Sequence, residues 1–245
     1  MLRARTCRSP SGWNTAQAVG ITREEMDAWA ARSHQRAVAA IDAGKFVDEI
    51  IPLKVQQLDG SVIDFSVDEH PRRDTTVEKL AGLKPLHPEI EGFSITAGNS
   101  SGTNDAAAAV ALVDYAYADA EKLTKLATVK AWAAAGVAPR DCGLGAVKVI
   151  GKVLQRAGLK PSDVALWEIN EAFASVPIAA CREYGIDEEL VNFSGSGCSL
   201  GHPIAASGAR MVTTLVYELQ RRGGGIGVAA MCAGGGQGGA VVIEV

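Results

Sequence analysis

The sequence predicts an α/β fold in which a mixed β-sheet is layered with helices. From residue 126 onward, short apolar runs alternate with stretches of helical periodicity, which is the pattern of helices packed on a sheet. The last two apolar runs, 226–231 and 240–245, are joined by a glycine-rich connection that is too short for a crossover. We therefore expect this final pair to be antiparallel and the sheet to be mixed.

The first element is a helix that begins after Thr22. Thr22 and Glu25 have the spacing of a capping box, and apolar residues follow at helical intervals. Gly44 stands where such a helix would end.

The segment that follows is polar and irregular. Residues 46–96 contain two short β-like runs, at 50–55 and 62–65. Residues 106–118 are almost entirely Ala, Val, Leu and Tyr, which predicts an element covered on both faces.

The remaining elements alternate in type, and Gly158 and Gly185 stand where two of the helices would end. In order, they are an apolar run at 127–134, a helix at 146–157, a strand at 164–169, a helix at 171–184, a strand at 190–193, a helix at 204–222 and the strands 226–231 and 240–245.

Composition excludes several classes of protein. With 47% apolar residues and a net charge of −4, the chain has no basic footprint for nucleic acid or an anionic membrane. No apolar run approaches the roughly 20 residues of a membrane helix. The five cysteines are odd in number and include no C-x-x-C pair, which argues against a disulfide framework or a zinc site. The arginine-rich opening, 1–12, has no apolar core and is no secretory signal, so we expect a reducing cytoplasm.

One histidine lies in a rigid turn. His202 stands between Gly201 and Pro203, just before a predicted helix whose positive end favours a neutral, proton-accepting imidazole. The alternative is a turn histidine that only satisfies local hydrogen bonds. We expect the other histidines to be solvated; they are His34, His70 and His87.

Asn170 and the glycine-rich loop 234–239 lie at the ends of two other predicted strands. Asn170 lies at a strand-to-helix junction, where side chains point into the ligand crevice of α/β proteins, although a helix N-cap would equally explain it. The G-x-G-x-x-G of 234–239 leads into a strand rather than a helix, so it is no dinucleotide fingerprint. The loop instead allows close backbone approach beside Cys232. Two further cysteines, Cys181 and Cys198, are expected to be small core or loop residues.

Together, Asn170, His202 and Cys232 place an amide, an imidazole and a thiol at three strand ends, and we expect them to converge. A neutral imidazole beside a thiol suits acyl transfer or proton abstraction next to a carbonyl.

These segments resemble the thiolase family. N-E-A-F-A at 170–174, G-H-P-I-A-A-S-G-A-R at 201–210 and C-A-G-G-G-Q-G at 232–238 are similar to its three C-terminal signatures, in order. T-A-G-N-S-S-G-T-N-D at 96–105 resembles the exit of its loop domain.

The resemblance implies that the chain contains a complete C-terminal domain but only parts of the N-terminal half and the loop domain. Residues 12–103 are similar to part of the thiolase loop domain, 104–125 to a remnant of the N-terminal half and 126–245 to the complete C-terminal domain. Residues 1–11, which contain Cys7, match nothing in the family. The family's acylated cysteine is therefore expected to be missing from this chain.

The same resemblance implies the site residues. His202 corresponds to the base that activates the nucleophile, Asn170 to the residue that holds a water in the first oxyanion hole, and Cys232 to the acid/base at the α-carbon. The backbone N–H of Gly234 corresponds to a donor of the second oxyanion hole. The implied CoA-binding residues are Ser101, Arg72, Ala172 and Phe173. The sequence does not distinguish Arg72 from Arg73 as the residue that meets the nucleotide end of CoA.

The implied function is a thiolase-type acyltransferase, either an acetyl-CoA acetyltransferase or a 3-ketoacyl-CoA thiolase. It would catalyse reversible Claisen condensation or thiolytic cleavage of substrates such as acetoacetyl-CoA, without metal or organic cofactor. One alternative is a non-catalytic thiolase-like protein that binds CoA or a partner, and a weaker one is a decarboxylating ketosynthase relative. Expected partners are acyl-CoA or CoA and either further copies of the chain or a complementary N-terminal thiolase segment.

Overall fold

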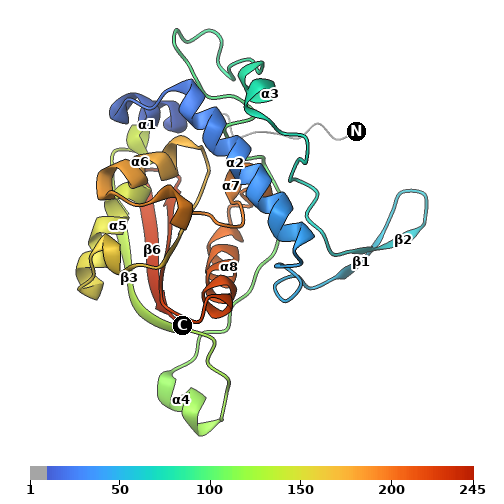
Figure 1. Ribbon diagram of the computed structural model, residues 1–245, viewed down its shortest axis with the longest axis vertical. Coiled ribbons are helices and arrows are strands. Elements are labelled where there is room, and N and C mark those ends of the chain that lie inside the picture. Colours follow the sequence, from blue (N-terminus) through green and yellow to red (C-terminus); the bar gives the residue numbers. More distant parts are fainter. Residues whose placement is uncertain (1–9) are drawn as a thin grey trace.

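A four-stranded mixed sheet with strand order β3-β6-β5-β4 forms the centre of the computed structural model, which describes residues 10–245 (Figure 1). Its strands are β3 (Thr128–Gly136), β4 (Leu166–Ile169), β5 (Ile226–Ala233) and β6 (Gln237–Glu244). Strands β4 and β5 are parallel, whereas β6 is antiparallel to both β5 and β3. The predicted mixed sheet and antiparallel final pair are confirmed.

Helices cover both faces of this sheet. Helices α5 (Leu144–Ala157) and α6 (Ser175–Tyr184) share one buried cluster with alternate residues of β5, namely Val228, Ala230 and Cys232. Ala229 belongs instead to the cluster formed with α8 (Ser207–Arg221). This alternation follows from the two-residue period of a strand. Each large apolar side chain buried in this way contributes about 1.5–3 kcal/mol.

The predicted N-terminal helix is confirmed as α2 (Arg23–Asp42). The Thr22 hydroxyl accepts from the Glu25 amide at 3.3 Å, and the Glu25 carboxylate accepts from the Thr22 amide at 2.8 Å. Gly44 follows the helix with φ of 67°, in the left-handed region. Helix α1 (Ser11–Val19) packs on α6, and α2 contacts the short helices α3 (Val77–Ala81) and α7 (Gly197–Leu200).

The two β-like runs form a hairpin that projects from the body of the molecule (Figure 1). Strands β1 (Leu53–Gln56) and β2 (Val62–Phe65) pair antiparallel.

The prediction for residues 106–118 is wrong. Residues 105–113 form no helix or strand, and helix α4 (Tyr115–Ala120) projects from the molecule (Figure 1). Leu112 is 77% exposed and Val113 51%. A strand needs a hydrogen-bonded neighbour, and no strand within residues 10–245 pairs with this segment.

Element boundaries also differ from the sequence-based expectations. The strand expected at 190–193 is reduced to one parallel bridge between Val191 and Trp167, preceded by the short 3-10 helix η3 (Glu188–Leu190). Helix α6 begins at Ser175 rather than Glu171, because the backbone between them forms hydrogen bonds with other segments. For example, the Ala174 amide donates to the Asn99 carbonyl at 2.9 Å. Two further 3-10 turns are η1 (Pro139–Asp141) and η2 (Pro161–Asp163).

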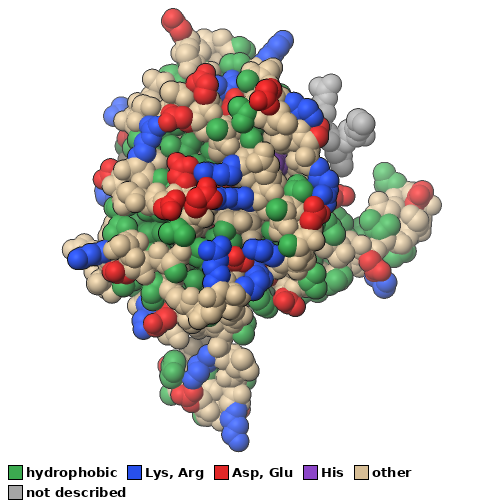
Figure 2. Space-filling model, viewed as in Figure 1, with side chains coloured by type: hydrophobic (Ala, Val, Ile, Leu, Met, Phe, Trp, Pro, Cys, Tyr) green, Lys and Arg blue, Asp and Glu red, His purple; other side chains and the backbone are tan. Residues whose placement is uncertain are grey.

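Within the part of the chain that the structure describes, no helix has the length and apolar character needed to cross a membrane. Figure 2 shows acidic and basic side chains interspersed over one face, without a large area of single sign. Cys7 and the opening arginines lie outside the described residues.

Candidate functional site

Two of the predicted site residues lie at the carboxyl ends of neighbouring parallel strands. Asn170 directly follows β4, and its backbone amide donates to the Ala230 carbonyl of β5 at 2.9 Å. Cys232 lies two residues farther along β5 and is 6% exposed. Strand pairing therefore places the two residues at the same edge of the sheet.

The Asn170 side chain is completely buried, and neither its amide nitrogen nor its amide oxygen has a hydrogen-bond partner within residues 10–245. The N-cap alternative is wrong, because Ala174 occupies the N-cap of α6. An unsatisfied buried polar group costs on the order of 1–3 kcal/mol. In a native protein such a group requires an explanation, and a catalytic role, a bound water and a bound ion are among the usual ones.

His202 is held as a neutral base by a short hydrogen-bond relay. Its Nδ1 lies 2.6 Å from the Ser207 hydroxyl, which itself donates to the Pro203 carbonyl at 3.0 Å. This direction assigns the proton to Nδ1 and leaves the lone pair on Nε2.

Burial lowers the pKa of His202, and the positive charge of Arg210 lowers that pKa further. The expected neutral imidazole agrees with this direction. Its main cause is burial rather than the helix end, because α8 begins five residues later, at Ser207.

The loop-domain exit packs directly against the segment after Asn170. The Ser101 amide donates to the Ala172 carbonyl at 3.0 Å, and Ser100 forms a bridge with Phe173. The Ser101 hydroxyl is buried without a hydrogen-bond partner within the described residues. Gly12 lies against Phe173 so closely that a Cβ there would come within 2.2 Å of the ring.

Asn104 connects this segment to the histidine turn. Its Oδ1 accepts from the His202 backbone amide at 3.1 Å. A Cβ on Gly201 would lie 2.5 Å from the Asn104 side chain, so this turn requires glycine for the close approach as well as for its φ of 95°.

The two candidate arginines differ in their contacts. Arg73 forms a bidentate ion pair with Asp42, at 2.6 and 2.8 Å. The exposed Arg72 guanidinium forms no ion pair within residues 10–245, while its backbone amide donates to His34 Nδ1 at 3.1 Å. Arg72 is thus the arginine whose charge is available to a ligand, although no contact links it to Asn170 or Cys232.

The glycine loop is a turn between β5 and β6, as the sequence indicates. Gly234 is exposed, and Gly235 and Gly236 have φ of 83° and 85°. A Cβ on Gly236 would lie 2.3 Å from the Val137 carbonyl, so the turn packs tightly on the residue after β3.

A thiol that sequence analysis did not single out lies beside Cys232. The Cys142 Sγ lies 3.0 Å from the Ala233 carbonyl, to which it donates when protonated. A hydrogen bond from the Cys232 thiol lowers the pKa of Cys142 to about 6, against the opposing effect of burial, and the Gly236 backbone N–H adds to the lowering. Ala233 is 91 residues farther along the chain, so no local pattern signals this contact.

One expectation about the histidines is wrong, and the expectation about two cysteines is confirmed. His34 is 5% exposed and stacks on His70 with ring centroids 6.3 Å apart, and burial lowers its pKa to about 4. It is buried because α2 turns this side chain towards the His70–Arg72 loop. Cys181 and Cys198 are buried, and burial raises the pKa of Cys181 to about 12.

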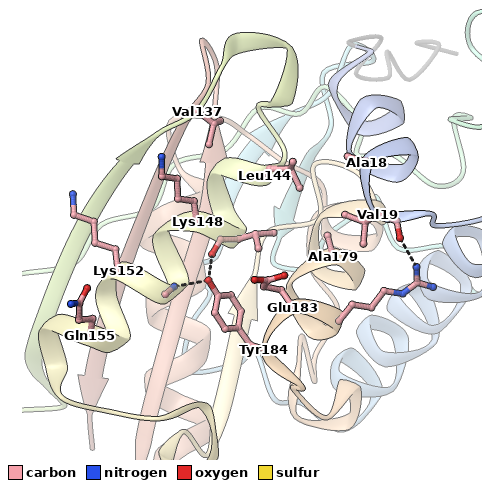
Figure 3. Close-up of a pocket in the computed structure, with 13 residues that line it drawn as sticks. Ala18, Val19, Val137, Leu144, Lys148, Lys152, Gln155, Ala179, Glu183 and Tyr184 are labelled. Atoms are coloured by element: carbon pink, nitrogen blue, oxygen red, sulfur yellow. Dashed lines mark hydrogen bonds between the residues drawn. The ribbon is translucent and has the colours of Figure 1, made fainter.

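A wide groove lies away from these residues, between α1, α5 and α6 (Figure 3). Its volume is about 950 Å³, and Lys148, Lys152 and Glu183 line it. The Tyr184 hydroxyl at its wall donates to the Val147 carbonyl at 2.8 Å and accepts from the Gly151 amide at 3.1 Å. None of the predicted site residues lines this groove.

Two family models match the chain. The model of the thiolase N-terminal domain matches residues 10–116, and that of the thiolase C-terminal domain matches residues 123–245.

Curated relatives and solved structures agree with these matches. An acetyl-CoA acetyltransferase of Pseudomonas aeruginosa is 47% identical over 94% of this chain and 58% of its own length. A crystal structure of the Bacillus anthracis acetyl-CoA acetyltransferase, 44% identical, superimposes with a TM-score of 0.91 over 96% of this chain and 59% of its own. The crystal structure of human mitochondrial 3-ketoacyl-CoA thiolase in complex with CoA is 38% identical. It superimposes with a TM-score of 0.86 over 96% of this chain and 57% of its own. The chain thus spans somewhat more than half the length of these relatives.

Proposed function

Because the chain belongs to the thiolase family, we propose that it supplies the base, the acid and the water-holding amide of an acyl-transfer site acting on CoA thioesters. The observation that carries the proposal is the buried Asn170 amide, which lies at the end of β4 beside the Cys232 end of β5 and has no hydrogen-bond partner among residues 10–245.

His202 is the base of this site. Its Nε2 lone pair accepts the proton of the acyl-accepting thiol, while the relay through Ser207 holds the imidazole orientation. The Asn170 amide fixes a water that, with His202, stabilises the thioester oxyanion.

Cys232 is the second acid/base. In synthesis its thiolate removes a proton from the α-carbon of the second acyl-CoA, and in cleavage its thiol protonates the leaving enolate. The Gly234 N–H lies in the exposed turn two residues farther on and donates to the second oxyanion. These roles require the side chains of Asn170, His202 and Cys232 to converge, which stays a prediction.

The acyl-accepting thiol comes from a thiolase segment outside these 245 residues, on the same polypeptide or on another. Cys181 and Cys198 are buried with raised pKa values, which is unsuited to a nucleophile. We assign residues 12–103 to the loop domain, 104–125 to the N-terminal half and 126–245 to the C-terminal domain. The exposed segment 105–113 would become a strand where an N-terminal thiolase segment pairs with it.

CoA binds along the loop-domain exit. The buried Ser101 hydroxyl, which has no hydrogen-bond partner in the described part of the chain, is available to the pantetheine, and Ala172 and Phe173 lie beside it. The exposed Arg72 guanidinium, which forms no ion pair with the described residues, is available to the phosphates of the nucleotide end.

The test is a thioester-absorbance assay of acetoacetyl-CoA thiolysis with the chain alone and with an added N-terminal thiolase fragment that carries its cysteine. We expect no turnover alone and turnover with the fragment, falling by on the order of 10²–10⁴-fold in Cys232→Ala. Cys181→Ala is the matched control, because it removes a buried thiol that is not assigned to the site. Robust turnover by the chain alone would overturn the assignment of the nucleophile.

Calorimetry with millimolar CoA separates the alternatives. Heat of binding without turnover in the presence of the fragment would favour a non-catalytic CoA-binding protein, and no heat would contradict the CoA site. A cysteine at position 232 argues against the decarboxylating ketosynthase relative, since those enzymes usually have a histidine there. Self-association and a cytoplasmic location stay predictions.

A further inference from the structure

The Cys142 and Cys232 sulfurs are brought together by a close approach of α5 to the β5–β6 hairpin. Gly145, in the first turn of α5, packs on β6 so tightly that a Cβ there would lie 2.5 Å from the Gln237 carbonyl. A Cβ on Gly238 would lie 2.0 Å from the Gly145 carbonyl. Because Gly238 is the register partner of Cys232, these two glycines let the start of α5 reach the thiol of β5.

Strand alternation directs Cys232 to this side of the sheet. Val228, Ala230 and Cys232 share the buried cluster that contains α5. Cys142, two residues before the start of α5, is half-buried and packs against the same cluster. The Cys142 Sγ contacts the carbonyl of Ala233, the residue next to Cys232, at 3.0 Å. The Cys232 thiol is also the main group that lowers the pKa of Cys142.

We propose that Cys142 and Cys232 form a peroxide-responsive modification site, in which oxidation of the more exposed Cys142 is resolved by Cys232 to a reversible disulfide. Cys142 is exposed enough to meet a small oxidant, and Cys232, which precedes the Ala233 carbonyl that Cys142 contacts, is placed to act as the resolving thiol. Low thiol pKa, solvent access and an adjacent resolving cysteine together mark redox-sensitive cysteines.

The chemistry balances in two steps. The Cys142 thiolate attacks one oxygen of hydrogen peroxide, which breaks the O–O bond and gives the sulfenic acid and hydroxide. The Cys232 sulfur then attacks the Cys142 sulfur, displacing the hydroxyl, which leaves as water with the thiol proton. A dithiol reductant reverses the reaction by thiol–disulfide exchange.

The consequence for activity rests on the proposed function. If Cys232 is the acid/base, the disulfide removes its ionisable thiol and stops both condensation and cleavage until it is reduced. The modification itself does not depend on that role, so it is measured separately.

The experiment uses the full chain with the substitution Cys7→Ser. The cysteines that can then be oxidised or alkylated are Cys142, Cys181, Cys198 and Cys232. The protein is treated with equimolar hydrogen peroxide, alkylated with iodoacetamide, digested and analysed by mass spectrometry. We expect a single crosslinked peptide pair, Cys142 with Cys232, that disappears after dithiothreitol.

Three variants sharpen this result. Cys142→Ser abolishes the crosslink. Cys232→Ser leaves a sulfenic acid on Cys142 that dimedone traps, and the matched control Cys198→Ser crosslinks as the parent does. Full alkylation of Cys142 and Cys232 after peroxide, or over-oxidation of Cys142 with Cys232 still alkylated, would overturn the proposal.

The fragment-complemented activity assay distinguishes the two proposals. Crosslinking with parallel, reversible loss of turnover supports both. Crosslinking with turnover retained sustains the modification site and contradicts the assigned role of Cys232.

Discussion

The Trp29 indole Nε1 donates to the Glu171 carboxylate at 2.8 Å, joining α2 to the loop after β4 across 142 residues of sequence. The carboxylate is fully buried and also accepts from the Ser33 hydroxyl, the Asn192 amide and the Cys198 backbone amide, at 2.6, 2.8 and 3.1 Å. Glu171 therefore holds the N-terminal helical segment against the domain that carries Asn170.

Replacing Glu171 should destabilise the whole chain. In Glu171→Ala, four buried donors lose their acceptor, and each unsatisfied group costs about 1–3 kcal/mol, so we expect the free energy of unfolding to fall by more than about 3 kcal/mol. Urea denaturation followed by tryptophan fluorescence measures it. The control is Glu188→Ala, which removes a half-exposed ion pair with Arg32. This variant should lower the free energy of unfolding by less than about 1 kcal/mol. Equal losses in the two variants would contradict the anchoring role.

The buried Glu168 should make stability fall as pH rises. Burial raises the pKa of Glu168 to about 7, against the lowering effect of Arg210, whose guanidinium lies 2.8 Å away. Between pH 4.5 and 7 the unfolded carboxyl is ionised while the folded one keeps its proton, so the folded state binds more protons and loses stability with rising pH.

The expected loss from this group is about 3 kcal/mol across that window. Glu168→Gln cannot titrate, so its curve of unfolding free energy against pH should lack this component. Parallel curves for the parent chain and the variant between pH 4.5 and 7 would show that the carboxyl has an ordinary pKa.

The charge of Arg210 should be visible in the titration of His202. Because Arg210 and burial both lower the pKa of His202, Arg210→Gln should raise that pKa while leaving the burial contribution in place. The measurement is an NMR titration of the imidazole Cε1 proton. Arg182→Gln, on α6, removes an equal charge that does not act on His202 and should leave the midpoint unchanged. No shift in Arg210→Gln would contradict the electrostatic coupling.

The reactivity of Cys142 should follow its hydrogen bond to Cys232. The rate of alkylation by iodoacetamide should rise with pH around a midpoint near 6, the pKa of Cys142. In Cys232→Ala the thiol donor is gone, so the midpoint should move upwards. Cys181, whose pKa burial raises to about 12, serves as the internal unreactive control. An unchanged midpoint in Cys232→Ala would mean that another group sets the pKa.

Local sequence patterns determined most of the helices and strands and their order, although helix α1 and the irregular segment 105–113 were not predicted. The capping box of Thr22 and Glu25, the helix-ending glycines and the short glycine connection before β6 are interactions between neighbours in the chain, and the mixed sheet follows from them. Asn170 and His202 could be proposed as site residues from the sequence, because a polar residue after an apolar run and a histidine in a Gly-Pro turn are local signals.

Only the tertiary structure decided the contacts between distant segments. The pairing of Cys142 with Cys232 depends on how closely Gly145 and Gly238 let α5 approach the hairpin, and the burial of His34 depends on the loop that covers α2. For the apolar segment 106–118, the sequence predicts contacts that the structure does not contain. Its composition predicts a covered element, but coverage is a property of neighbouring elements, and none of the described strands lies beside it. Local patterns report what a segment can form, whereas packing decides what it touches.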